Sequence, residues 1–298
     1  MRDKLKIVVL LLLTGVVASS GPARAGKCRA NPETHSEVGQ RQRIPLRIYR
    51  NFLMVAEGRL GGAPDVQNFI LDTGTAPSLI DARLVRQLGL ATIPSTFRAA
   101  GRTIPAQAAM IPEIEFGPIR AASLPMQVQD LSRLARDLGV PIAGILGLDV
   151  LSKSSFRLDY DKKEIEFGDV SREGIPVHVD ARAGLAVAEV RIEGKQARVL
   201  VDTGSDRIVL FGGNFAEAGW LALRNTSQSG ASLVDQKMYV QVFSAADIIL
   251  GGQHFSEDRA YFVPGSTDPE FDGLLGVRTL GFRAVSYDQA RGTIYLQK

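Results

Sequence analysis

The stretch Phe69-Ile-Leu-Asp-Thr-Gly-Thr75 returns later in the chain as Val199-Leu-Val-Asp-Thr-Gly-Ser205. Asp72 and Asp202 hold the same place in the two copies, 130 positions apart. A short apolar run that stops at a glycine turn is typical of a buried strand. One Asp-Thr-Gly is a common strand-end turn, whereas two copies in the same setting point to a shared role.

Two further pairs of segments recur at nearly this spacing, 129 and 127 positions. Residues 143–148 (Ala-Gly-Ile-Leu-Gly-Leu) match residues 272–277 (Asp-Gly-Leu-Leu-Gly-Val), and Leu-Asp-Tyr-Asp at 158–161 matches Val-Ser-Tyr-Asp at 285–288. The order of the pairs is conserved between the halves, and the repeat is far longer than that of a solenoid. The sequence therefore predicts two homologous lobes, residues 41–170 and 175–298, after a leader at 1–25.

The local patterns within each lobe are mainly those of strands. Apolar or alternating runs bounded by glycine or proline occur at residues 46–49, 68–71, 113–116, 164–167, 185–192 and 196–201. Residues 81–90 and 128–138 have helical spacing, and Gly139 and Pro141 end the second of these segments. We predict all-β lobes with a few short helices.

Composition limits the classes of protein and site. The chain has 298 residues, of which 45% are hydrophobic and 22% charged, and this excludes a disordered chain and a collagen-like fibre. The single cysteine excludes a disulfide framework and a four-cysteine zinc site. The three histidines are scattered. We therefore expect no metal and no cofactor.

The first 25 residues have the pattern of a secretory signal. A basic start precedes an apolar run over residues 7–18, and Ala23-Arg24-Ala25 resembles a cleavage site. The leader also carries the whole formal charge of +3, and the rest of the chain is neutral, so we expect no nucleic-acid partner. We expect an exported monomer, periplasmic or secreted by a bacterium. The alternative is an uncleaved leader that anchors the protein at a membrane.

The two Asp-Thr-Gly motifs, each followed by an apolar-apolar-Gly segment, resemble the aspartic peptidases. In that family the pepsins have two lobes and the retropepsins dimerise a single lobe. The resemblance covers both halves of the chain, through Asp72 with Gly147 and Asp202 with Gly276. It implies a bilobal acid-protease fold with a central cleft, in which Asp72 and Asp202 are catalytic.

The residue types around the two acids suit the hydrolysis of a peptide bond by a pair of carboxyls. Two carboxyls about 3 Å apart cannot both ionise, so one can accept a proton from water while the other donates one. Which carboxyl is the base stays open, because the pKa values belong to the pair. The resemblance implies that supporting residues fix the dyad: Thr73, Gly74, Thr75, Thr203, Gly204 and Ser205. The first hydroxyl of each motif would bind the opposite lobe, and Thr75 and Ser205 would donate to the carboxylates.

The resemblance also implies a flap hairpin in each lobe, its tip roughly 25 residues after the aspartate. Gly101, in residues 98–102, and Gly230, in residues 228–232, lie there. The sequence departs from pepsins because no tyrosine occurs between Tyr49 and Tyr160, where a pepsin carries its flap tyrosine. Asp206 and Arg207 follow the second motif and are interpreted as solvated loop charges.

Two functions from different classes follow. The first is an aspartic endopeptidase that hydrolyses an extended polypeptide without a cofactor. The second is a peptide-binding protein on the same fold with little or no turnover, because fold alone does not fix function. The two retained carboxyls favour the first.

Overall fold

The computed structural model describes residues 42–99, 102–180, 184–213, 227–233, 236–266 and 268–298, and two short backbone strands near the N-terminus. The first lobe contains β4 (Arg47–Tyr49), β5 (Leu53–Leu60), β6 (Gln67–Leu71), β7 (Leu79–Asp81), β8 (Thr92–Ala99), β9 (Arg102–Phe116), β10 (Ile119–Gln129) and β11 (Gly144–Leu146). Its helices are α1 (Ala82–Gln87), α2 (Ser132–Leu138) and α3 (Leu148–Leu151).

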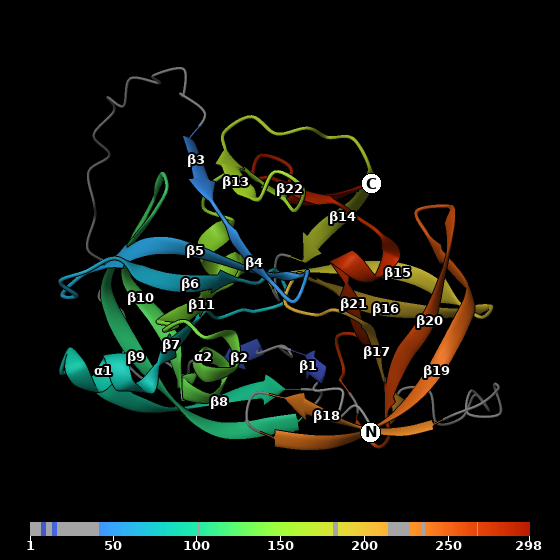
Figure 1. Ribbon diagram of the computed structural model, residues 1–298, viewed down its shortest axis with the longest axis horizontal. Helices are drawn as coiled ribbons and strands as arrows, with labels where there is room; N and C mark the ends of the chain where they lie inside the picture. Colours follow the sequence, from blue (N-terminus) through green and yellow to red (C-terminus); the bar gives the residue numbers. More distant parts are fainter. Residues whose placement is uncertain are drawn as a thin grey trace, which may run out of the picture.

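The second lobe repeats the first strand for strand. It contains β15 (Leu185–Ile192), β16 (Lys195–Asp202), β17 (Ile208–Phe211), β18 (Ser227–Leu233), β19 (Gln236–Leu250), β20 (Gln253–Val263), β21 (Gly273–Gly276) and the 3-10 helix η3 (Val277–Leu280). The sheet order β8-β9-β10-β7-β11-β6-β5 of the first lobe matches β18-β19-β20-β17-β21-β16-β15 of the second. The predicted all-β, two-lobed fold is confirmed, and the lobes lie side by side in Figure 1.

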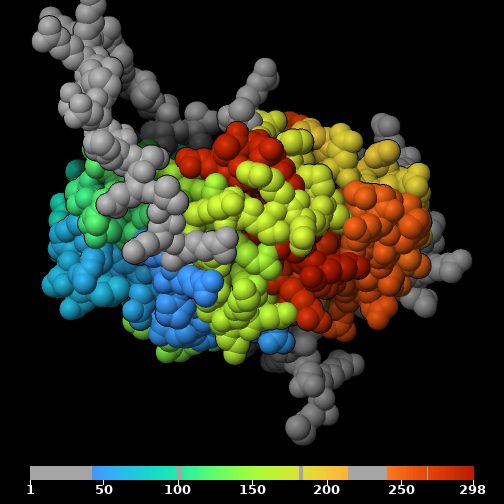
Figure 2. Space-filling view, turned by 90° about the horizontal axis from the view of Figure 1, so that it is seen from above, coloured from blue at the N-terminus to red at the C-terminus, as the bar shows by residue number. Residues whose placement is uncertain are grey.

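A third layer joins the lobes and was not predicted. It pairs β3 (Gln42–Pro45), β13 (Glu164–Phe167) and β12 (Phe156–Asp159) with β22 (Ala284–Asp288), β23 (Thr293–Gln297) and β14 (Ile175–Asp180). At its centre β12 pairs antiparallel with β22, and Leu158 lies opposite Val285. These two residues begin the third repeated segment, so the pseudo-twofold relation of the lobes passes between them. Figure 2 shows this layer, where yellow-green and red segments meet between the lobes.

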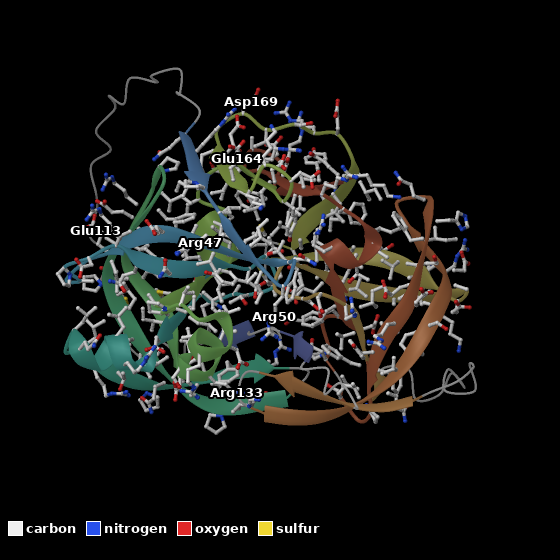
Figure 3. The ribbon with its side chains drawn as sticks, in the orientation of Figure 1. Arg47, Arg50, Glu113, Arg133, Glu164 and Asp169 are labelled. Atoms are coloured by element: carbon white, nitrogen blue, oxygen red, sulfur yellow. The ribbon has the colours of Figure 1, made fainter. Side chains whose placement is uncertain are left out.

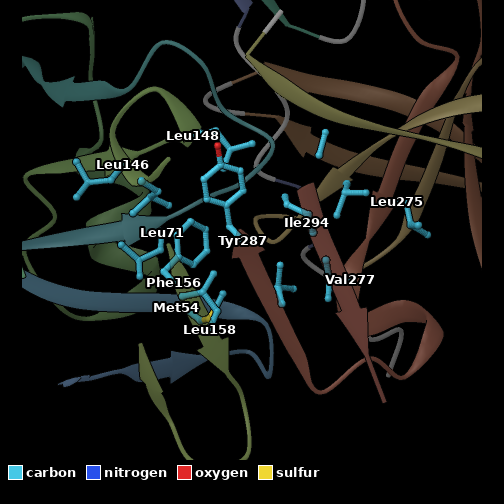
Figure 4. Close-up of a cluster of buried hydrophobic side chains, with 14 of the residues drawn as sticks. Met54, Leu71, Leu146, Leu148, Phe156, Leu158, Leu275, Val277, Tyr287 and Ile294 are labelled. Carbon is cyan, nitrogen blue, oxygen red and sulfur yellow. The ribbon is translucent and has the colours of Figure 1, made fainter. Parts of the chain in front are cut away.

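The core continues through this junction. One buried cluster contains Leu71 and Leu158 of the first lobe together with Leu275 and Val285 of the second. Figure 4 shows part of that cluster, with side chains converging from both sides. Burial of apolar surface between the lobes fixes their relative position, on which any site between them depends.

The expected helices are shorter than their patterns suggested. Asp81 caps α1 by accepting a hydrogen bond from the Arg83 N–H, and the helix ends at Gln87. In the second segment Val128 lies in β10, where it pairs with Ile80 of β7, so α2 begins only at Ser132. Likewise, the expected strand at 113–116 is the end of the long β9. Pairing with neighbouring strands overrides the local helical spacing at residues 128–129.

The two N-terminal strands each add an edge strand to the sheet of one lobe, and in Figure 1 both lie between the lobes. β1 (Ile7–Val9) pairs in parallel with β18, and β2 (Thr14–Val16) pairs antiparallel with β8. Both fall in the apolar run of the leader. Among the described residues, no helix has the length and apolar character needed to cross a membrane.

Candidate active site

The two Asp-Thr-Gly loops leave equivalent strands of the two lobes. Asp72 follows β6, and Asp202 is the last residue of β16. β11 and β21, which carry the apolar-apolar-Gly segments, run parallel to these strands. A Cβ on Gly147 would lie 2.0 Å from the Thr75 carbonyl oxygen, and one on Gly276 would lie 2.6 Å from that of Ser205. The repeated glycine is therefore required because the motif loop packs directly on it.

The carboxyls of Asp72 and Asp202 are fully buried and face each other between the lobes. A Cβ added to Gly74 would lie 2.6 Å from Asp202 Cγ, and one added to Gly204 would lie 2.5 Å from Asp72 Oδ2. Each carboxyl thus packs against the glycine of the opposite loop. The Gly74 N–H donates to Asp72 Oδ1 at 2.8 Å, and the Gly204 N–H donates to Asp202 Oδ1 at 2.6 Å.

Two threonines cross-link the loops. The Thr73 N–H donates to Thr203 Oγ1 at 3.0 Å, and the Thr203 N–H donates to Thr73 Oγ1 at 3.2 Å. In turn the Thr73 hydroxyl donates to the Val201 carbonyl at 2.9 Å, and the Thr203 hydroxyl donates to the Leu71 carbonyl at 3.2 Å. All four bonds cross from one lobe to the other, as the resemblance implied. These four hydrogen bonds fix the position of the Asp72 loop relative to the Asp202 loop.

The fourth motif residue differs between the lobes. The Thr75 hydroxyl donates to Asp72 Oδ2 at 2.8 Å, as expected. The expectation is wrong for the Ser205 hydroxyl, which donates to the Arg207 carbonyl at 3.0 Å. That serine side chain turns back into its own loop, where a carbonyl is within reach. Among the described residues, Asp202 Oδ2 is buried and accepts no hydrogen bond.

Burial and proximity shift the pKa values of both acids upward. Burial raises the pKa of Asp72, whereas its hydrogen bonds with Asp202, Thr75 and Gly74 act in the opposite direction. Burial raises the pKa of Asp202 well above its ordinary value, and the negative charge of Asp72 raises it further. The pair therefore keeps one proton at a pH where isolated carboxyls have lost theirs. The poorer set of donors favours that proton on Asp202.

Residues behind the loops were missed by the sequence patterns. In the first lobe the Ser78 hydroxyl and N–H donate to Asp149 at 2.6 and 3.0 Å, and Ser78 Oγ accepts from the Gly147 N–H. The equivalent positions in the second lobe are Ile208 and Arg278. A comparison of Gly-Leu-Asp at 147–149 with Gly-Val-Arg at 276–278 could have revealed this difference.

Arg278 instead makes a contact between the lobes. Its guanidinium lies 4.9 Å from the ring centre of Tyr160, and its Nη1 donates to the Phe282 carbonyl at 3.0 Å. Tyr160 is buried, and burial raises the pKa of its hydroxyl. The negative charges of Asp202 and Asp72 act in the same direction. A buried phenol of one lobe thus contacts a cation of the other, close enough to the dyad for its charges to affect the phenol.

Asp206 is less exposed than the sequence suggested. Burial raises its pKa, while the positive charges of Arg207 and Arg50 act in the opposite direction. Arg50 comes from the turn between β4 and β5 of the first lobe and lies near the middle of the molecule in Figure 3. A charge from one lobe therefore lies near the motif loop of the other.

Flap hairpins occur in both lobes. In the first flap Ala99 of β8 pairs with Arg102 of β9, the last described pair of the hairpin. Gly101 itself lies outside the described residues. Gly230 lies within β18 opposite Tyr239, and the ladder continues past it to the pair of Leu233 and Gln236. The expectation that Gly230 marks the tip is therefore wrong, because β18 continues in register beyond it.

Comparisons with known proteins agree with this arrangement. A family model described as aspartyl protease matches residues 56–150 and 188–279, together more than half of the chain. Each matched region contains one Asp-Thr-Gly loop and one apolar-apolar-Gly strand. No curated protein matches the chain. Within the part of the chain that the structure describes, no group of three histidine, cysteine or acidic side chains could hold a metal ion.

Proposed function

Since the chain belongs to the aspartyl protease family, we propose that it is an endopeptidase in which Asp72 and Asp202 activate a water molecule. The observation that carries this proposal is the buried pair of acids, each packed against the glycine of the opposite loop. The ionised carboxyl accepts a proton from water, and the resulting hydroxide adds to the peptide carbonyl carbon. The protonated carboxyl donates to the carbonyl oxygen. Collapse of the intermediate then breaks the C–N bond as the leaving nitrogen takes up a proton.

The substrate we propose is an extended polypeptide. β8 and β18 form the outer edges of the flap hairpins, and each already accepts a short strand of this chain, β2 and β1. An edge that pairs with one extended segment can pair with another through the same main-chain hydrogen bonds. Side-chain pockets would then add specificity.

We further propose that the protein is an exported bacterial monomer, periplasmic or secreted. The support is the basic start, the apolar run and the Ala-x-Ala pattern of the first 25 residues. N-terminal sequencing of the purified protein tests this part independently of activity. A start at Gly26 supports cleavage, and a start at Met1 supports a retained leader.

The test of the activity uses purified protein and unfolded polypeptide substrates from acid to neutral pH. Asp72→Asn and Asp202→Asn each lose one member of the acid–base pair, so we expect cleavage to fall about 10³-fold or more. Asp169→Asn is the matched control, because Asp169 lies in the connection between β13 and β14, at the top of the molecule in Figure 3, and not in either motif loop. Wild-type cleavage in either dyad variant would overturn the proposal. Peptide binding without cleavage by the wild type would favour the binding-protein alternative.

A further inference from the structure

One charged side chain of the first flap, Arg98, reaches acidic residues of the second lobe. Arg98 lies near the end of β8, paired with Thr103 just before the turn of the hairpin. Its Nη2 lies 2.9 Å from Glu270 Oε1, and its Nη1 lies 3.6 Å from Asp268 Oδ1. Both acids belong to the segment between β20 and β21 of the second lobe. That segment leads directly into the strand beside the Asp202 loop.

The two acids of this contact are joined to each other by a hydrogen bond. The Asp268 side chain is only 1% exposed, and its Oδ1 accepts a hydrogen bond from the Glu270 N–H at 2.9 Å. This bond orients the two carboxyls toward the same guanidinium. An arginine that contacts two carboxylates with separate nitrogens has a more defined geometry than a single-point surface pair.

Apolar packing supports the same contact. Phe97, next to Arg98, is 7% exposed and belongs to a buried cluster that also contains Val240 and Phe271 of the second lobe. Phe271 lies in the same segment between β20 and β21 as Asp268 and Glu270. Phe97, near the end of the first hairpin, is therefore buried with residues of the opposite lobe beside the ion pairs of Arg98. Burial raises the pKa of Asp268 and the Arg98 charge lowers it, as expected for a paired carboxylate.

We propose that Arg98 is a positioning residue that holds the first flap closed against the second lobe through Asp268 and Glu270. This inference rests on the proposed peptidase function. A closed flap excludes bulk water and keeps substrate over the dyad. The first flap has no tyrosine for that purpose, because none occurs between Tyr49 and Tyr160. In place of a tyrosine contact, the ion pairs of Arg98 with Asp268 and Glu270 hold this flap against the second lobe.

The first test measures the flap and not the reaction. Hydrogen exchange of the β8–β9 hairpin amides is compared in the wild type and in Arg98→Met. We expect the amides near the hairpin turn to exchange about 10-fold faster in the variant, because loss of a partly buried ion pair favours the open flap. Arg283→Met is the matched control, since Arg283 pairs with Asp161 between the lobes, in the shared layer. Unchanged exchange in Arg98→Met would overturn this latch, by which we mean the contact of Arg98 with Asp268 and Glu270.

The second test measures catalysis. We expect Arg98→Met to lower kcat/KM about 10-fold, mainly through KM, while the pH dependence stays that of the wild type because the dyad is untouched. Arg98→Lys keeps a charge and restores part of the loss. Glu270→Gln, at an exposed position, should weaken the same step, and its effect should not add to that of Arg98→Met. Fully additive effects would contradict a shared contact.

The two proposals fail in different ways. If the wild type shows no cleavage but Arg98→Met still accelerates exchange in the flap, the latch stands and the peptidase function fails. If the wild type cleaves and Arg98→Met changes neither exchange nor KM, the peptidase function stands and the latch fails. Salt gives a further check, because an ion-pair latch weakens as ionic strength rises.

Discussion

The two lobes share a backbone and differ in the side chains behind their catalytic loops. Strand order, loop geometry and the crossed threonine bonds are the same in both. In the first lobe Thr75 donates to its aspartate and Asp149 braces the loop through Ser78. In the second, Ser205 turns away from its aspartate. Symmetric backbones therefore bring the two acids together, whereas asymmetric donors make them chemically different.

The threonine cross-links are common to both lobes. We expect their removal to lower the free energy of unfolding more than the other substitutions discussed below. Thr73→Val leaves the Val201 carbonyl and the Thr203 N–H without their partner, and Thr203→Val does the same to the Leu71 carbonyl and the Thr73 N–H. Each pair of buried groups should cost about 3 kcal/mol of unfolding free energy. Urea unfolding measures both variants, with Thr→Ser at each position as the control. A large difference between the two valine variants would break the symmetry.

The side chains behind the two motif loops, Asp149 and Arg278, differ between the lobes. We expect their replacement to lower the free energy of unfolding by a smaller amount. Asp149→Ala removes the acceptor of both the Ser78 hydroxyl and the Ser78 N–H, and should cost about 2 kcal/mol. Arg278→Met, at the equivalent place in the second lobe, removes one hydrogen bond and the contact with the Tyr160 ring. It should cost about 1 kcal/mol. A larger cost for Arg278→Met, measured in the same urea titration, would show that the second lobe relies on its brace more than the first.

Sequence predicted the parts of this molecule that depend on local spacing. The repeated motifs placed the two acids, and strand patterns gave most of the elements around them. The shared layer was not predictable in this way, because Leu158 and Val285 pair across lobes and no local pattern encodes which strand meets which. The tip of the second flap was misplaced at Gly230 for a related reason, since a glycine alone does not mark a turn when the ladder continues past it. The partners of Arg98 could not be predicted from the sequence either, because they lie in the other lobe and depend on how the two lobes pack together.

The hydroxyls of Thr75 and Ser205 give the finest test of the comparison. The Thr75 bond favours ionised Asp72 and lowers its pKa, so Thr75→Ala should raise that pKa. The acid limb of kcat/KM against pH, where activity appears as the dyad loses its first proton, should then move up by about 0.5 to 1 pH unit. Ser205→Ala should leave the limb in place, because that hydroxyl donates to the Arg207 carbonyl. Equal shifts in both variants would mean that Ser205 binds Asp202 in the working enzyme and that the lobes differ less than their side chains indicate.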